Sequence, residues 1–376
     1  MKYGLSVKLL VLAGSALWTM SASAQEVERS NSGDVAAPRD GVEIVVVAQR
    51  QAYVGDLPLK DVPQNVQSLS SEALDVAGIT RLDSALDNVS GVSRLNNFGG
   101  LWDSYAIRGF AGDVNLPSGF LVNGFNGARG YGGPRDTSSV ERIDVLKGPT
   151  SALFGRGEPG GTVNIVTKKP EFRRHGALMV QGGSFNSYRV EGDFTTPLSD
   201  NFAVRINGAY DDADSYRDTV QTKKIFITPS LLLKLGERTS VSYEMEFASQ
   251  RIDFDRGVPI FNRDFKRLPP SRFLGEPGDD PIKIDVLGHQ LQLQHDFSDD
   301  WSLLVGAAYR TTRLRGVGQY FELVASRQPF FTDGTTLSRQ RRFEDSQAES
   351  VIARAELTGH FEIGGLANIS RARGAR

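Results

Sequence analysis

Strict alternation of apolar and polar residues after Pro170 constrains the fold of this chain more than any other feature of its sequence. In residues 188–195, Tyr188, Val190 and Phe194 alternate with polar or charged residues. The same pattern recurs in residues 202–211, 241–247, 290–297, 301–310 and 351–361. Because successive side chains of a strand point to opposite faces, each segment has one apolar and one polar face. Repeated segments of about ten residues with this pattern are typical of a membrane β-barrel with a wet lumen.

A soluble antiparallel sandwich is the alternative, because its strands also alternate. The length of the segments and the unusually high charge of the polar face favour the barrel. The connectors favour it too, because tight and long ones alternate along the chain, apart from a short first loop near Phe185, as periplasmic turns and extracellular loops do. The tight connectors are residues 197–201, 236–239 and 298–300, and the long ones are residues 213–221, 252–283 and 315–344.

The composition excludes several classes of protein. The 43 Lys and Arg residues nearly balance the 45 Asp and Glu residues, so the chain lacks the basic excess that is usual in a nucleic-acid-binding protein. It contains no Cys, which excludes disulfides, zinc–thiolate sites and thiol nucleophiles. The 4 His residues show no metal-ligand spacing, and no nucleophile, base and orienting group can be assembled. We therefore predict no metal site and no enzyme activity.

The N-terminus has the three parts of a secretion signal. Lys2 and Lys8 supply positive charge, Leu9 to Met20 form a short apolar core, and Ala22 to Ala24 are small residues at a cleavage site. A buried helix is the alternative. We predict a signal peptide over residues 1–24, cleaved near Ala24. Beyond it, no apolar run reaches the roughly 18 residues that a spanning helix needs.

Residues 57–169 predict a small mixed α/β domain, which follows a disordered mature N-terminus over residues 25–56. Residues 71–77 and 80–86 have helical spacing. Short strands are predicted at residues 104–108, 119–122, 140–146 and 162–167, separated by Gly-rich turns.

Several motifs of this domain, taken together, resemble the TonB-dependent outer-membrane receptors. The longest of these motifs spans Val140 to Gly155 (VERIDVLKGPTSALFG). A second one follows it from Gly160 to Pro170 (GGTVNIVTKKP). Also similar are Ile107–Phe110 (IRGF), Leu121–Gly124 (LVNG) and Asp87–Val92 (DNVSGV). The resemblance extends from about Glu43 to Gly365. It implies a plug domain, residues 57–169, inside a transmembrane β-barrel of about 22 strands.

The resemblance implies uptake of a ferric siderophore across the bacterial outer membrane. TonB, with its inner-membrane energising complex, would be the partner that supplies energy, and outer-membrane lipid would surround the barrel. Leu268–Gly278 and Val286–Leu293 look like the ferric-siderophore branch, specifically its hydroxamate group. The ferric siderophore would be the transported ligand, and no tightly bound cofactor is implied. The mature N-terminus is too short for an added signalling domain. Motifs shared across the family leave another cargo, such as cobalamin, as an alternative.

The segment Glu43, Ile44, Val45, Val46 and Val47, with Ala48, resembles the TonB box. Its β-branched residues favour an extended chain. Such a chain can bind by adding a strand to the sheet edge of a partner. The alternative is an ordinary first strand of the plug.

Two cations lie in motifs where the family places plug residues that face barrel carboxylates, namely Arg108 and Lys147. Such a pair would act as a latch between plug and barrel, and a local ion pair inside the plug is the alternative. Lys147 takes a position where Arg is usual, which would lose a bidentate contact.

Four residues in turn-rich segments resemble the outward-facing apices of the plug: Phe98, Trp102, Arg129 and Tyr131. Aromatic faces with one or two cations suit a bulky ferric siderophore, so we predict ligand binding there. The alternative is that these residues only pack a loop against the barrel.

The chain departs from the family in its barrel. Residues 170–366 hold about eight strands, against about 22 in a complete barrel with a plugged lumen. Residues 367–376 carry three Arg and no alternation, so we predict an aberrant tail without a strand there. These observations suggest a truncated or frameshifted reading frame, and a non-transporting remnant is therefore a further alternative.

Overall fold

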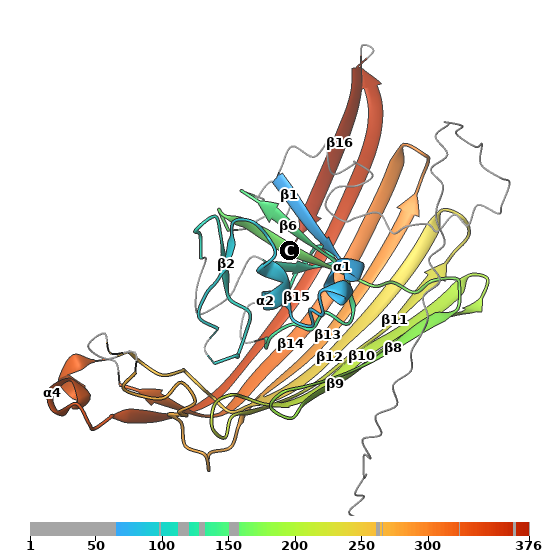
Figure 1. Cartoon of the computed structure of the whole chain (residues 1–376). Helices are drawn as coiled ribbons and strands as arrows, with labels where there is room; N and C mark the ends of the chain where they lie inside the picture. Colours follow the sequence, from blue (N-terminus) through green and yellow to red (C-terminus); the bar gives the residue numbers. More distant parts are fainter. Residues whose placement is uncertain are drawn as a thin grey trace, which may run out of the picture. The chain divides into compact units, whose positions relative to one another are not determined.

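The alternating segments form one antiparallel sheet in the computed structural model of the chain, here called the wall (Figure 1). Its strands are β8 (His175–Gly183), β9 (Ser187–Ser199), β10 (Phe202–Asp214), β11 (Gln221–Lys234), β12 (Thr239–Ile252), β13 (Ile282–Asp296), β14 (Trp301–Phe321), β15 (Arg339–Ile363) and β16 (Leu366–Ala375). Each strand pairs with its neighbours in sequence, and β8 and β16 are the two edges of the sheet. The predicted antiparallel barrel wall is therefore confirmed.

The structure describes residues 65–97, 99–111, 120–127, 132–149, 158–260, 264, 266–322, 324–363 and 366–375, without the side chains of 331 and 360–375. All of these residues belong to one unit, Val46–Arg376. Among them, no helix has the length and the hydropathy that crossing a membrane requires.

The plug contains a five-stranded sheet with the order β1-β6-β7-β4-β5. Its elements are β1 (Asn65–Ser70), α1 (Ser71–Val76), α2 (Leu82–Leu86), β2 (Val92–Arg94), β3 (Tyr105–Ile107), β4 (Phe120–Val122), β5 (Phe125–Asn126), β6 (Val140–Lys147) and β7 (Gly161–Thr167). The strands β2 and β3 form a separate pair. Leu82, Ala85 and Leu86 of α2 pack with Ile143 and Val163 of the sheet in one apolar core.

Both helices and the four strands that we predicted for the plug are present, and their ends lie within a few residues of the predicted ones. The helix α1 begins after Ser70, whose hydroxyl accepts a hydrogen bond from the backbone N–H of Ala73, which is the usual role of Ser at a helix start. The strand β1 was missing from the sequence prediction. It pairs with β6 along its whole length, from Asn65 opposite Lys147 to Ser70 opposite Arg142.

The predicted alternation of short and long connectors is present in the wall. Short turns join β9 to β10, β11 to β12 and β13 to β14, while β12 and β13 are separated by residues 253–281. The predicted loop 315–344 needs correction, because β14 and β15 stay paired as far as Phe321 opposite Arg339. A strand ladder is made of main-chain groups, so it can continue beyond the apolar part of the strands.

The tail expected at residues 367–376 also needs correction. Residues 367–375 belong to β16, which pairs with β15 from Leu366 opposite Ile363 to Ala375 opposite Arg354. Main-chain pairing does not require alternating side chains, and for that reason the lack of alternation did not exclude a strand. The wall therefore has nine strands in the described part of the chain, against about eight predicted.

Candidate plug and wall interface

The polar face of the wall lies against the plug. Arg189, Lys224 and Glu244 are buried there, whereas their sequence neighbours Val190 and Ile225 are 42% and 37% exposed on the other face. This is the alternation that the sequence predicted, and it assigns the charged face to the lumen side. Among the places where the side chains on that face meet the plug are an acidic anchor, a neighbouring Arg, a polar cluster at the end of β7, and an apolar contact.

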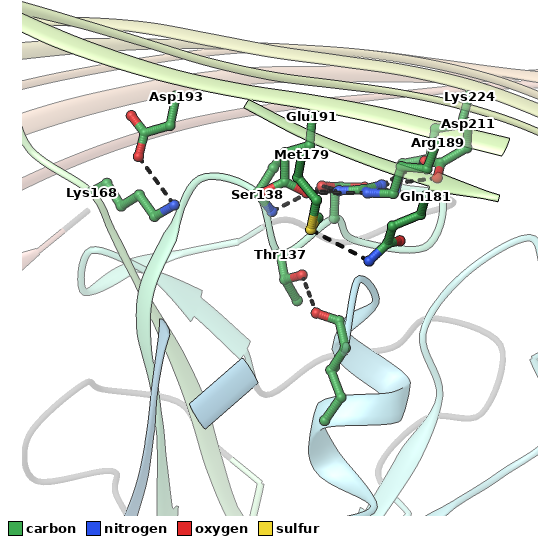
Figure 2. A network of polar contacts seen from close by, with 12 residues as sticks. Thr137, Ser138, Lys168, Met179, Gln181, Arg189, Glu191, Asp193, Asp211 and Lys224 are labelled. Atoms are coloured by element: carbon green, nitrogen blue, oxygen red, sulfur yellow. Dashed lines mark hydrogen bonds and ion pairs between the residues drawn. The ribbon is translucent and has the colours of Figure 1, made fainter. Parts of the chain in front are cut away.

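The acidic anchor is Asp136 of the plug, which lies between basic side chains of β9 and β11. Arg189 donates from its two terminal nitrogens to the two carboxylate oxygens of Asp136, both at 2.9 Å. Lys224 donates to Oδ2 of Asp136 at 3.1 Å. The side chains of Asp136, Arg189 and Lys224 are only 1%, 5% and 9% exposed. Figure 2 shows Arg189 and Lys224 directed from the wall toward the plug segment that contains Ser138.

Arg189 also binds two carboxylates of the wall. Its guanidinium contacts Asp211 on β10 at 2.8 Å and Glu191 on β9 at 2.5 Å (Figure 2). Burial alone would raise the pKa of Asp136, but Lys224 and Arg189 outweigh it and hold this pKa well below the usual range. The anchor is thus a charged network that joins the plug to three strands of the wall.

Arg135, the residue before the anchor, contacts a carboxylate of β12 that is also bound by an Arg of β14. The Arg135 guanidinium lies 3.8 Å from Glu246 of β12, and Arg310 of β14 donates to the same carboxylate at 3.0 Å. Burial, together with the nearby Arg310, lowers the pKa of Arg135 to about 10. Two adjacent plug residues therefore meet wall charges of opposite sign on different strands.

A polar cluster follows at the end of β7. Thr167 donates to Glu244 of β12 at 2.5 Å, and Lys169 lies 3.3 Å from the same carboxylate. Asn123 of the plug donates to Gln290 of β13 at 3.0 Å. Two cavities of about 20 Å³ each lie between plug and wall and are lined in part by Glu244 and Glu246. Each is large enough for about one water molecule.

The apolar contact contains Trp102, one of the predicted ligand residues. Its side chain is 4% exposed and packs with Leu101 against Ile252, Phe254 and Ile284 of the wall. In this structure Trp102 therefore packs a loop against the wall, which is the alternative considered above. Ligand binding by Trp102 stays a prediction.

Beside Trp102, the loop after β12 and the strands β14 and β15 present aromatic and cationic side chains together. The rings of Phe254 and Tyr320 are 4.7 Å apart. The guanidinium groups of Arg256 and Arg342 lie 5.5 and 5.0 Å from the centre of the Tyr320 ring. We call Phe254, Arg256, Tyr320 and Arg342 the mouth cluster, because they lie at the long-loop end of the strands.

The structure places the predicted latch residues within the plug. Lys147 is buried and donates to Oε1 of Gln67 at 3.0 Å and to the hydroxyl of Ser90 at 2.9 Å. Burial and the nearby Arg108 lower the pKa of Lys147. Arg108 is exposed and has a positive φ of 51°. Among the described residues neither makes an ion pair with the wall, so their role as a latch stays a prediction.

Other predicted site residues lie outside the described part of the chain. These are Phe98, Arg129 and Tyr131 of the ligand prediction, and Glu43, Ile44, Val45, Val46 and Val47 of the TonB-box prediction. The sequence analysis missed Arg135 and Asp136. The available signal was a pair of opposite charges just before the Val140 motif, in a domain that must face a charged lumen.

Comparison with known proteins identifies the class to which this arrangement belongs. Residues 58–162 match the family model of the TonB-dependent receptor plug domain. The metal-pseudopaline receptor CntO of Pseudomonas aeruginosa is 35% identical over 355 residues, which cover 93% of this chain and 49% of that protein. The ferrioxamine receptor of Yersinia enterocolitica is 30% identical over 267 residues, or 68% of this chain and 36% of that protein.

Solved structures share the fold. The open form of the ferric-catecholate import receptor Fiu from Escherichia coli K12 superposes with a TM-score of 0.74 at 22% identity, covering 85% of this chain and 50% of that one. The ferripyoverdine receptor of the outer membrane of Pseudomonas aeruginosa gives 0.73 at 21% identity, covering 85% and 43%. The chain belongs to the TonB-dependent receptors. It spans about half the length of CntO.

Proposed function

We propose that this receptor takes up a metal chelate of the ferric-siderophore class across the bacterial outer membrane, with energy supplied through TonB. The observation that carries the proposal is the character of the contact between plug and wall. The plug has an apolar core of its own, whereas much of its contact with the wall consists of ion pairs, polar hydrogen bonds and two small cavities. A plug held in this way can shift or leave the lumen without losing its core.

The relatives support the class of cargo. CntO is named for a metal–pseudopaline complex and the Yersinia receptor for ferrioxamine. Both names describe metal chelates, and we propose a chelate of this kind as the ligand and no tightly bound cofactor. The outward apolar face of the wall supports the proposed location, because a barrel in a membrane has an apolar band on its outside.

The test of the proposed function is a proline substitution in the TonB-box segment. Val46→Pro removes a backbone donor that strand addition requires, so crosslinking to TonB and chelate uptake should both be lost. Ala36→Pro, in the same mature N-terminal segment, is the matched control and should leave both unchanged. Normal crosslinking of the Val46→Pro receptor to TonB would overturn the assignment of the segment.

The mouth cluster gives a prediction about the ligand. Tyr320→Ala removes the ring over which two guanidinium groups lie. If this ring packs against a bound chelate, its loss removes one aromatic contact of about 1–2 kcal/mol, so chelate affinity should fall by about tenfold. Calorimetry with ferrioxamine B and with a metal–pseudopaline complex measures the change. Tyr216→Ala, which removes a similar stack with Arg217 in another loop, is the control. Equal affinities for the two variants would contradict a role of the mouth cluster in chelate binding.

A further inference from the structure

A short connector joins the last strand of the plug to the first strand of the wall. It consists of residues 168–174, between β7 and β8, and forms neither helix nor strand. At its plug end, the backbone N–H of Lys168 donates to the carbonyl of Ser139 at 2.8 Å. Pro170 is buried in its middle, where the proline ring fixes its own φ and restricts the residue before it. The connector therefore has little conformational freedom at its centre.

Two residues of the wall hold the main chain of the connector. The guanidinium of Arg205 on β10 donates from Nη1 to the carbonyl of Lys169 at 2.9 Å. The hydroxyl of Thr195 on β9 accepts from the backbone N–H of Glu171 at 2.9 Å. Arg205 and Thr195 lie directly opposite each other in the strand register. The Arg205 side chain is 5% exposed and Thr195 is 0% exposed, so both hydrogen bonds are shielded from water. We call these two wall residues the clamp.

Ion pairs hold the Arg205 guanidinium in position. Its other two nitrogens, Nε and Nη2, donate to the two carboxylate oxygens of Asp193 on β9, at 2.8 and 2.6 Å. The same carboxylate lies 3.2 Å from Nζ of Lys168 (Figure 2), and the Glu171 carboxylate lies 3.4 Å from Arg205. A bidentate pair fixes the orientation of a guanidinium. The donor that reaches the connector carbonyl is therefore held in place before the connector binds, which a lysine without this planar fork could not reproduce.

The clamp bears on how the plug can move. The uptake proposed above applies a pull at residues 43–48, ahead of the plug. That pull reaches the wall through the connector, because the connector is the covalent link between plug and wall. Without the clamp, tension would continue along the chain into β8, which is held to β9 by one ladder of main-chain hydrogen bonds and could be peeled away one pair at a time.

We propose that Arg205 is a positioning residue for transport, which together with Thr195 holds residues 168–171 on the wall while the plug moves. Displacement of the plug then ends at the connector, and β8 stays in the wall. The inference rests on the uptake proposed above and identifies the point about which the plug pivots. Bonds to the connector main chain suit this task, whereas the anchor at Asp136 uses side chains that can separate and meet again as the plug shifts.

Single-molecule stretching of the full chain in detergent tests the clamp. The chain contains no Cys, so Ala48→Cys and Ser298→Cys introduce the only two attachment points, one ahead of the plug and one in the turn between β13 and β14. In the native background the plug should unfold while the connector stays on the wall. In Arg205→Met the connector should be released in the same event, which adds up to about 25 Å of extension at about 3.3–3.6 Å per residue.

Two further variants keep the test independent of folding. Arg313→Met is the matched control, because Arg313 is an exposed wall Arg paired with Asp345, and its extension should equal that of the native background. Thr195→Val keeps every charge around the clamp and removes only the acceptor of the Glu171 N–H. Hydrogen exchange of that amide should become about tenfold faster in Thr195→Val.

Two results would overturn the proposal: equal extensions in the native background and in Arg205→Met, or equal exchange of the Glu171 amide in the native chain and in Thr195→Val. The length of the extension reports where unfolding stops, and a general loss of stability would lower the force without moving that point. Because the force is applied directly, neither TonB nor a chelate takes part. Failure of this test is therefore distinguishable from failure of the proposed uptake.

Discussion

Replacing Asp136 with alanine is expected to weaken the docking of the plug on the wall by about 3 kcal/mol. The change leaves Lys224 buried without its carboxylate and removes two hydrogen bonds from Arg189. Breaking a buried ion pair costs about 3–5 kcal/mol, because the remaining charge stays desolvated. We expect the lower end of that range, because Arg189 keeps its ion pairs with Asp211 and Glu191.

Urea titration followed by Trp102 fluorescence measures this effect, because Trp102 is buried where the plug meets the wall. The measurements are made in a Trp301→Phe background, which removes the fluorescence of Trp301 in the wall. Asp87→Ala is the matched control: Asp87 is also a plug carboxylate paired with an Arg, but its side chain is 47% exposed. An exposed pair of this kind contributes about 0–1 kcal/mol. Equal shifts for the two variants would show that Asp136 is not an anchor.

A double substitution tests whether Asp136 acts through Lys224. Lys224→Met removes the charge that Asp136→Ala would leave unpaired while keeping a side chain of similar length. The two substitutions together should therefore cost less than the sum of the single ones, with a coupling energy of about 1–3 kcal/mol. Additive costs would mean that the lysine contributes nothing to the anchor.

The strands of the wall were predictable because their side-chain pattern reports directly on their surroundings. A strand with the plug on one side and an apolar exterior on the other must alternate, as residues 188–195 do. The ends of strands were less predictable. The pairing of Phe321 with Arg339 and the strand β16 are ladders of main-chain groups, and the sequence there carries no alternating signal.

The partners across the interface could not be derived from local patterns. The motif that contains Lys147 predicted a cation in contact with the wall, whereas Lys147 binds Gln67 and Ser90 inside the plug. Asp136 is a plug charge that contacts both β9 and β11. Which charges meet depends on how the plug is placed against the register of the wall, and this is a property of two domains together.

The second large effect concerns Asp103, which is expected to make the plug less stable as the pH rises. Its carboxyl is buried beside Trp102 and accepts a hydrogen bond from the backbone N–H of Arg135 at 2.8 Å. Burial raises the pKa of Asp103 to about 6, and the neighbouring Asp83 adds to the rise, while Arg81 and Arg135 oppose it. In an unfolded chain the pKa of an Asp is about 3.9.

The sign of the effect follows from these two pKa values. Between about pH 4 and pH 6 the folded chain holds a proton on Asp103 that the unfolded chain has lost, so stability falls as the pH rises. The stabilisation by the protonated form is complete below about pH 4 and is lost as the pH passes about 6. A difference of about two pKa units corresponds to about 3 kcal/mol. Asp136 acts in the opposite direction, since its lowered pKa means that its contribution is lost in acid.

Asp103→Asn should therefore flatten the pH dependence between about pH 4 and pH 6 while leaving the loss of stability in stronger acid. The Asn side chain has the shape of Asp, can still accept the hydrogen bond from Arg135 and does not ionise. Urea midpoints at pH 4, 5, 6 and 7 measure the slope, with Asp87→Asn as an exposed control that should keep it. The same slope in the native chain and in Asp103→Asn would show that another group titrates there. A slope lost only in Asp103→Asn would assign the pH dependence to this carboxyl. Asp103 follows Trp102 in the chain and accepts a hydrogen bond from Arg135. One titrating group would then connect the apolar contact with the segment that makes the charged contacts.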